Sequence, residues 1–225
     1  MILIAAVAAA LLGALGPRVL RRVPEPPEPD ADKLPYAVLS EFRFLAAGLA
    51  VTAAVLAGVV AWRIDDAELL PVWIVLAAVG SWLSFVDWHT RLLPFVLVAP
   101  LYLVTLALVA LGALLLDDLD VLKHALIANA VVFAIFLAMH LFARRFYGGA
   151  FGYGDVRLSA VLSLALGALG YSEVIVGMYA GFILGAVLGI VLSKLKLVDP
   201  NGYAFGPYMV LGAVIGAAWG PAIYA

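Results

Sequence analysis

The chain has 225 residues, of which 66% are hydrophobic and 12% are charged, and its mean hydropathy is +1.14. Soluble domains carry charge on about a quarter of their residues, so this composition predicts a membrane protein. The net charge of −2 excludes a basic face for nucleic acid, and the absence of cysteine excludes disulfides, thiolate nucleophiles and cysteine-based zinc sites.

Eight apolar segments follow one another along the chain. Each is read as a membrane span, because about 20 apolar residues cross roughly 30 Å of hydrocarbon. Charged residues, glycine and proline separate the segments. The sequence therefore predicts an all-α polytopic bundle of about eight transmembrane helices, at residues 1–15, 42–62, 69–86, 95–116, 121–141, 156–169, 172–192 and 204–224.

The N-terminal region differs in character from the rest. No basic residue precedes the first apolar run, and three arginines follow it. A secretory signal has the reverse polarity, so we expect this span to be retained with its N-terminus outside. The polar stretch 16–41 holds five prolines within residues 24–35 and predicts an extended linker. We divide the chain into residues 1–41, a span plus a proline-rich cytoplasmic linker, and residues 42–225, a membrane-embedded domain.

The distribution of basic residues predicts the orientation. With eight spans and the N-terminus outside, the loops on one side hold 11 of the 13 lysines and arginines. Arg63 and Lys123 lie on the other side. Positive residues mark the cytoplasmic side, so these loops are expected to face the cytoplasm from a bacterial inner membrane.

Two aspartates lie where a span meets a short polar segment on that side. Asp87 ends the third span, and Asp155 precedes the sixth, with two complete spans between them. A carboxylate near a bilayer is costly unless it is paired, hydrated or used. Two close carboxylates cannot both ionise cheaply, so near neutral pH they share a proton. One can then take a proton from water while the other polarises a carbonyl, which is the chemistry of amide hydrolysis.

Each aspartate also has a purely structural explanation. Asp155 could cap the helix that follows it, and Asp87 could pair with Arg91 four residues on. Their shared side and their positions beside spans favour the functional interpretation. Gly152 and Gly154 would allow close approach of a substrate beside Asp155.

Arg157 could reach the membrane interface or hold a backbone carbonyl. No metal or cofactor site is predicted. His124 and His140 lie at opposite ends of one span, and the acids at 117–120 form a short solvated turn.

Three stretches of the sequence resemble the prepilin peptidases, which are membrane aspartic proteases. Residues 152–157, Gly-Tyr-Gly-Asp-Val-Arg, resemble the family signature G-x-G-D-x-K/R. Asp87 with Leu93-Pro94 is similar to the first active-site segment of the family. Residues 205–213 are similar to its F-G-P-x-L-x-x-G-A opening of the last helix. Order and spacing agree from about residue 69 to the C-terminus.

The resemblance implies that Asp87 and Asp155 are the catalytic pair of an aspartic endopeptidase. Its substrate would be a prepilin or pseudopilin-like protein with a basic leader and an apolar N-terminal helix, cut on the cytoplasmic face after a glycine. Residues 42–225 would form the peptidase domain. The supporting motif residues would be Gly152, Gly154, Arg157 and Pro94.

The N-terminal third departs from the family pattern. Pro17 stands where the family has asparagine, and the cytoplasmic module with two C-x-x-C pairs is replaced by the proline-rich stretch. Full-length bacterial members use this region while N-methylating the new N-terminus with S-adenosylmethionine. The hypothesis is therefore an enzyme that cleaves without methylating and needs no cofactor.

Two other functions remain open from the sequence. A proton- or ion-coupled carrier would use the carboxylates to bind ions, although no inverted repeat is evident. A non-catalytic scaffold of a pilus or secretion assembly would keep the fold alone. Gly181, Gly185 and Gly189 form overlapping G-x-x-x-G patterns, which predict close helix packing within the chain or in a homodimer.

Overall fold

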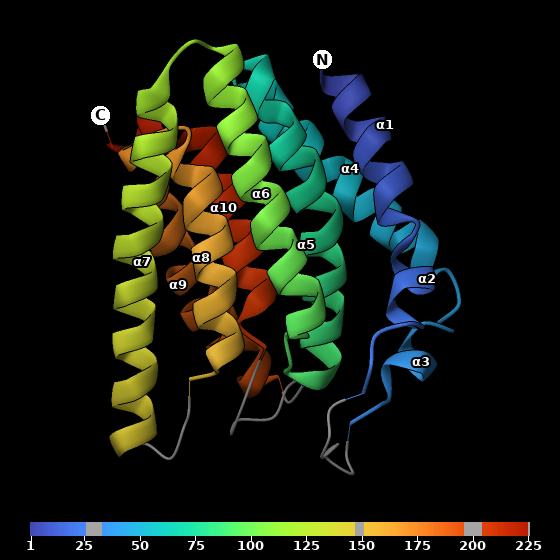
Figure 1. Cartoon of the computed structure of the whole chain (residues 1–225). Helices are drawn as coiled ribbons and strands as arrows, with labels where there is room; N and C mark the ends of the chain where they lie inside the picture. The colour runs from blue at the N-terminus through green and yellow to red at the C-terminus, as the bar shows by residue number, and fades with distance from the viewer. Residues whose placement is uncertain (26–32, 147–150, 196–203, 225) are drawn as a thin grey trace.

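The computed structural model describes residues 1–25, 33–146, 151–195 and 204–224, and in these ranges every regular element is a helix. The predicted all-α class is confirmed. Figure 1 shows long helices running between two ends of one bundle, with both termini at the same end. The helices are α1 (Ile2–Gly13), α2 (Gly16–Leu20), α3 (Tyr36–Leu39), α4 (Leu45–Arg63), the 3-10 turn η1 (Ala67–Leu69), α5 (Leu70–Thr90), α6 (Phe95–Leu115), α7 (Leu119–Phe146), α8 (Tyr153–Gly167), α9 (Tyr171–Lys194) and α10 (Gly206–Tyr224).

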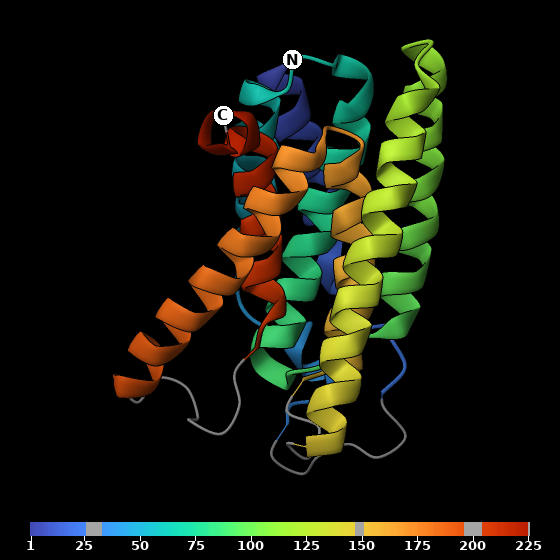
Figure 2. The ribbon, with the colours of Figure 1, turned by 90° about the vertical axis from the view of Figure 1, so that its left-hand side faces the viewer.

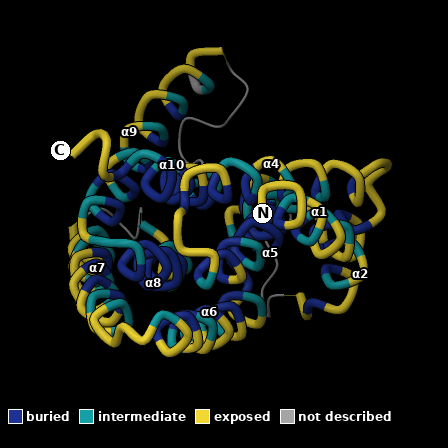
Figure 3. The backbone as a smooth tube through the Cα atoms, turned by 90° about the horizontal axis from the view of Figure 1, so that it is seen from above, coloured by how far each residue is buried: buried dark blue, intermediate teal, exposed yellow. Residues whose placement is uncertain are grey.

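Among the described residues, seven helices are long and apolar enough to cross a membrane, where eight spans were predicted. The exception is α8, whose 15 residues extend only roughly 22 Å at 1.5 Å per residue. Its neighbours α6, α7, α9 and α10 surround it, and Figure 3 shows it buried inside the ring that they form. A helix covered on all sides is apolar all round, which is why its sequence is indistinguishable from that of a span.

The last two helices pack through glycine. The contact is formed by glycines, which have no side chain, so the two backbones pack directly on each other. These are Gly177 and Gly181 on α9 and Gly212 and Gly216 on α10. Gly185 lies against the ring of Phe205. Close packing is thus confirmed for Gly181 and Gly185 within the chain, while a homodimer stays a prediction. Towards its C-terminal end α9 leans away from the bundle (Figure 2).

The stretch predicted to be an extended linker is folded in its described parts. It contains α2 and α3, and the Glu25 carboxylate caps α3 by accepting the backbone N–H of Tyr36 at 2.6 Å. Leu20 and Leu39 pack with Tyr36 in a buried cluster that includes Trp82 of α5. The prediction of an extended linker is wrong in these parts, because apolar side chains on either side of the prolines are buried against α5. Residues 26–32 lie outside the described residues.

Helices α5, α7 and α9 end, and α6, α8 and α10 begin, at one end of the bundle, the lower end in Figure 1. The sequence places most basic residues at this end. Lys196 and the predicted break at 199–202 lie outside the described residues.

Candidate active site

Asp87 lies in the last turn of α5 and is only 4% exposed. Helix α5 ends at Thr90 because Arg91 adopts the left-handed conformation, with φ of 54° and ψ of 31°. The Arg91 N–H then donates to the Asp87 carbonyl at 2.7 Å, as in a common C-terminal helix cap. This cap fixes the backbone that carries the Asp87 carboxylate.

The Asp87 carboxylate meets the start of α10. The backbone N–H of Gly206 donates to Asp87 Oδ2 at 2.8 Å. A Cβ at position 206 would lie 2.8 Å from the same oxygen, so the approach requires glycine. The N-terminus of a helix carries partial positive charge and unsatisfied N–H groups, which favour a carboxylate there. The Phe-Gly-Pro segment therefore supplies a direct partner for Asp87.

Asp155 lies in the first turn of α8, where Gly152 is the N-cap. The Asp155 carboxylate lies beside Gly152, where an added Cβ would stand 3.1 Å from Asp155 Oδ2, and the Asp155 N–H donates to the Gly152 carbonyl at 3.2 Å. The N-cap role considered for Asp155 from the sequence is wrong, because Gly152 is the N-cap and Asp155 is the third helical residue. A carboxylate at this position still stabilises the start of the helix. The carboxylate is also close enough to Asp87 for the two to interact electrostatically. Asp155 therefore both stabilises the start of α8 and has a place in the acid pair.

The loops that carry the two motifs pack directly on each other. A Cβ at Gly154 would lie 3.0 Å from the Cβ of Leu93. Leu93 is buried in the connection between α5 and α6, and Pro94 is the N-cap of α6. Leu93 and Gly154 thus pack on each other, which places the connection after α5 against the first turn of α8.

The segment before Gly152 is held by α7. His140 Nδ1 lies 2.7 Å from the Phe151 carbonyl oxygen, and its ring contacts the ring of Tyr153. Phe151 also packs against Phe136 and Phe205. From the sequence, His140 was expected to lie at the end of a span without a metal, and nothing local shows that its partner lies 11 residues on.

Tyr36 of α3 is a site residue that sequence reasoning missed. It is buried, hydrogen-bonded through its side chain to Thr90, and within electrostatic range of Asp87. Burial and then the Glu25 carboxylate raise the pKa of the Tyr36 phenol, so it stays protonated. Thr90 Oγ1 donates to the Val86 carbonyl at 2.8 Å and accepts the Leu92 N–H at 3.3 Å, so Tyr36 interacts with a threonine that is held at the end of α5. A proline-rich stretch gave no signal for this contact.

The supporting motif residues predicted from the sequence lie in different surroundings in the structure. Gly152 and Gly154 lie at the start of α8 beside Asp155, and Pro94 is the N-cap of α6. The Arg157 guanidinium lies instead over the rings of Phe95 and Tyr153. Neither alternative considered for Arg157 included this aromatic contact. Within the ranges that the structure describes, no group of three His, Asp or Glu side chains could hold a metal ion.

The sequence is similar to those of known leader peptidases. Residues 74–193, which include both aspartates, match the model of the Type IV leader peptidase family. The prepilin leader peptidase/N-methyltransferase of Pseudomonas aeruginosa is 30% identical over 177 residues, or 76% of this chain and 57% of the relative. That of Haemophilus influenzae is 32% identical over 151 residues, or 66% of this chain and 60% of the relative.

The chain thus spans less than two thirds of the length of either relative. No solved structure matches it. The family match covers more than half of the chain and contains the ends of α5 and α8 that hold the two carboxylates. The chain belongs to the type IV leader peptidase family.

Proposed function

We propose that this chain is a membrane aspartic endopeptidase that removes the basic leader of a prepilin or pseudopilin-like protein. The observation that carries the proposal is that the buried Asp87 carboxylate at the end of α5 and the Asp155 carboxylate in the first turn of α8 lie within electrostatic range of each other. Asp87 also accepts the backbone N–H of Gly206, and Asp155 lies beside Gly152. The family supplies the substrate class, since its relatives are named for prepilin leaders.

The pair would work by sharing one proton. The ionised carboxylate takes a proton from water as the water oxygen bonds to the scissile carbonyl carbon, and the protonated carboxylate gives its proton to the carbonyl oxygen. The resulting tetrahedral intermediate collapses when the nitrogen takes a proton from the first acid and leaves as an amine. The pH dependence should be bell-shaped, and its two limbs should belong to the pair rather than to either residue. Asp155 is half-buried, which leaves a way in for the substrate.

The orientation is part of the same proposal. We place the end with the α5–α6 and α7–α8 connections in the cytoplasm of a bacterial cell, because basic residues concentrate there. A substrate with a basic leader and an apolar helix would meet the acid pair at this surface, and cleavage would follow a glycine. Residues 42–225 would be the peptidase domain. Single cysteines at Arg91 and Arg144 should resist impermeant thiol reagents in intact cells, and labelling from outside would contradict this orientation.

We propose further that the chain does not methylate the new N-terminus. The relatives carry N-methyltransferase in their names. This chain has no cysteine, and Pro17 replaces the asparagine of the family pattern. Neither feature touches the acid pair, so peptide cleavage and methylation should separate here.

Co-expression with a prepilin, followed by mass measurement of its N-terminus, tests both parts. Wild-type chain should remove the leader and leave a free α-amino group, whereas Asp87→Asn should leave the leader in place. An increment of about 14 Da at the mature N-terminus would show methylation. An intact leader with normally accumulated wild-type protein would contradict the peptidase assignment and favour a carrier or scaffold.

A further inference from the structure

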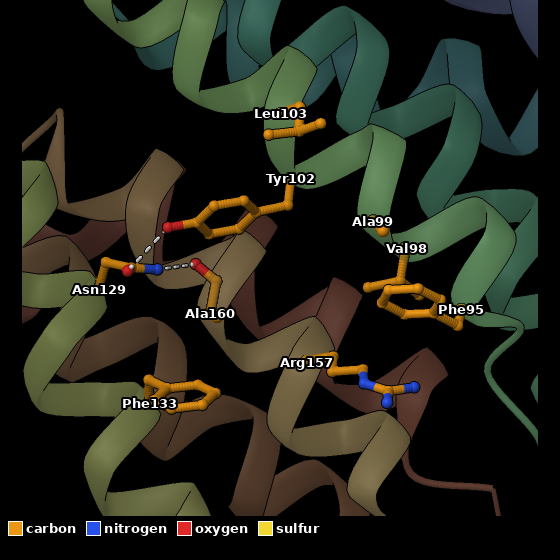
Figure 4. A pocket seen from close by; sticks show the side chains of 9 residues that line it. All are labelled: Phe95, Val98, Ala99, Tyr102, Leu103, Asn129, Phe133, Arg157 and Ala160. Atoms are coloured by element: carbon orange, nitrogen blue, oxygen red, sulfur yellow. Dashed lines mark hydrogen bonds between the residues drawn. The ribbon is translucent and has the colours of Figure 1, made fainter.

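A groove of about 440 Å³ runs between α6 and α7, with α8 as its floor. We call it the α6–α8 groove. Phe95 and Leu103 on its rim are 59% and 65% exposed, so it opens to the outside of the bundle, where a spanning helix meets hydrocarbon. Figure 4 shows the lining side chains, which are Phe95, Val98, Ala99, Tyr102, Leu103, Asn129, Phe133, Arg157 and Ala160.

The polar groups in the middle of the groove satisfy one another. The Tyr102 hydroxyl donates to Asn129 Oδ1 at 3.2 Å, and Asn129 Nδ2 donates to the Ala160 carbonyl at 2.6 Å. Both bonds are visible in Figure 4. These groups are already paired, so the middle of the groove offers a ligand only apolar surface. The part of a ligand that lies there would therefore be apolar too.

One end of the groove is positively charged. The Arg157 guanidinium lies 4.5 Å from the ring centroids of both Phe95 and Tyr153. Contact with aromatic faces leaves the N–H groups of its fork available. In the described ranges no carboxylate forms an ion pair with Arg157, and the contacts of its guanidinium are the cation–π contacts with these two rings. A guanidinium of this kind matches a phosphate, which it can bind through two parallel hydrogen bonds.

The groove is separate from the acid pair. Arg157 follows Asp155 by two residues on α8, and residues two apart on a helix do not share a face. Asp155 interacts with Asp87 of α5, whereas Arg157 lies against Phe95 at the start of α6. A polypeptide in the groove would therefore have α8 between it and the two carboxylates. This argues against the cleaved peptide as the occupant.

We propose that the α6–α8 groove binds one anionic phospholipid, with its phosphate at Arg157 and an acyl chain along the apolar lining towards Leu103. Charge complementarity selects this occupant, because the groove offers a cation at one end and apolar surface beyond it. Basic pockets between transmembrane helices bind anionic headgroups in this way. A zwitterionic lipid is disfavoured, because its ammonium would lie beside a guanidinium with no acid to receive it.

Mass spectrometry of the purified full-length chain under conditions that keep lipids bound tests the proposal. Equal amounts of palmitoyl-oleoyl phosphatidylglycerol and phosphatidylcholine would be added. Wild-type chain should retain phosphatidylglycerol in roughly fivefold excess, the factor that about 1 kcal/mol per basic residue at an anionic surface gives. Arg157→Gln should abolish this preference, and Ala99→Phe, which fills the groove, should reduce both adducts.

Two matched variants act as controls. Arg145→Gln removes an arginine that also lies over an aromatic ring, that of Phe146, but lies outside the groove. Leu111→Phe adds a ring to an exposed position of α6 beyond it. Both should behave as wild type. An unchanged preference in Arg157→Gln, or an equal loss in Arg145→Gln, would overturn the proposal.

Photocrosslinking identifies the occupant in the cell membrane. Benzoylphenylalanine at Leu103, on the rim, should yield a lipid adduct on the chain of the same mass as bound phosphatidylglycerol. Capture of a second copy of the chain or of a co-expressed prepilin at this position would assign the groove to a protein partner and contradict the proposal.

Discussion

Acidic residues gather at both ends of the bundle, in two very different settings. At one end the turn between α6 and α7 carries exposed acids, where Asp118 accepts the Asp120 N–H at 2.9 Å. Asp120 pairs with Lys123 at 3.3 Å, with the two side chains 65% and 66% exposed. At the other end Asp87 is 4% exposed and accepts a backbone N–H from a second helix.

The difference shows what distinguishes a candidate catalytic acid from a solvated one in a membrane protein. The acidic turn has more carboxylates, but an exposed ion pair is worth little, and each group there is hydrated or locally bonded. Asp87 and Asp155 come from separate helices and lie within electrostatic range of each other, with Asp87 buried and Asp155 half-buried. Burial and fixed backbone donors, rather than the number of acids, give proton chemistry a defined geometry.

Asparagine substitutions test this contrast with the largest expected effect. Asp87→Asn and Asp155→Asn should each lower the cleavage rate by at least ~10²–10⁴-fold, because asparagine keeps the size of the side chain but cannot ionise. Asp117→Asn and Asp120→Asn should cleave as wild type. The measurement is the rate of leader removal at matched protein levels. Equal loss in the turn variants would mean general instability and break the comparison.

The glycine partner of Asp87 offers the next largest effect. In Gly206→Ala the added Cβ would lie 2.8 Å from Asp87 Oδ2, so the carboxylate must move. A displacement of about 1 Å at a catalytic group can cost ~10²-fold in rate. Gly48→Ala is the matched control, since a Cβ at Gly48 meets nothing within 4 Å. Wild-type cleavage by Gly206→Ala would show that the contact with α10 is dispensable.

The smallest effect concerns Tyr36, which reaches the same end of the bundle from α3. Tyr36→Phe removes the hydrogen bond to Thr90 three residues after Asp87. A hydrogen bond contributes about 1 kcal/mol, so the cleavage rate should fall roughly fivefold. Tyr179→Phe, at a position that is 67% exposed on α9, should have no effect. The measurement is again the rate of leader removal. An unchanged rate in Tyr36→Phe would show that Tyr36 does not contribute and that the site is formed by α5, α8 and α10.

Much of the fold could be predicted because lipid imposes simple rules. Apolar runs and the charges between them predicted the helical class and most of the spans. The number of spans could not be predicted, because α8 is apolar through burial in protein rather than contact with lipid. Local sequence also concealed the roles of Tyr36 and His140, since both depend on partners brought near by folding.

The parts of the site that are formed by residues close together in the sequence could be predicted. Gly152 and Asp155 lie within one turn at the start of α8, and counting spans placed Asp87 on the same side. The contact of Gly206 with Asp87 spans 119 residues. The resemblance singled out the segment around Gly206, but only the structure shows what it touches.

The most direct test of the central claim is the cleavage rate of the double variant Asp87→Asn/Asp155→Asn beside the two single variants. Groups that act as one unit have strongly non-additive effects, since removing either already abolishes the shared function. The double variant should therefore cleave at the residual rate of the slower single variant, at matched accumulation in the membrane. Losses that multiply in the double variant would show that the two carboxylates act independently and would contradict a shared-proton pair.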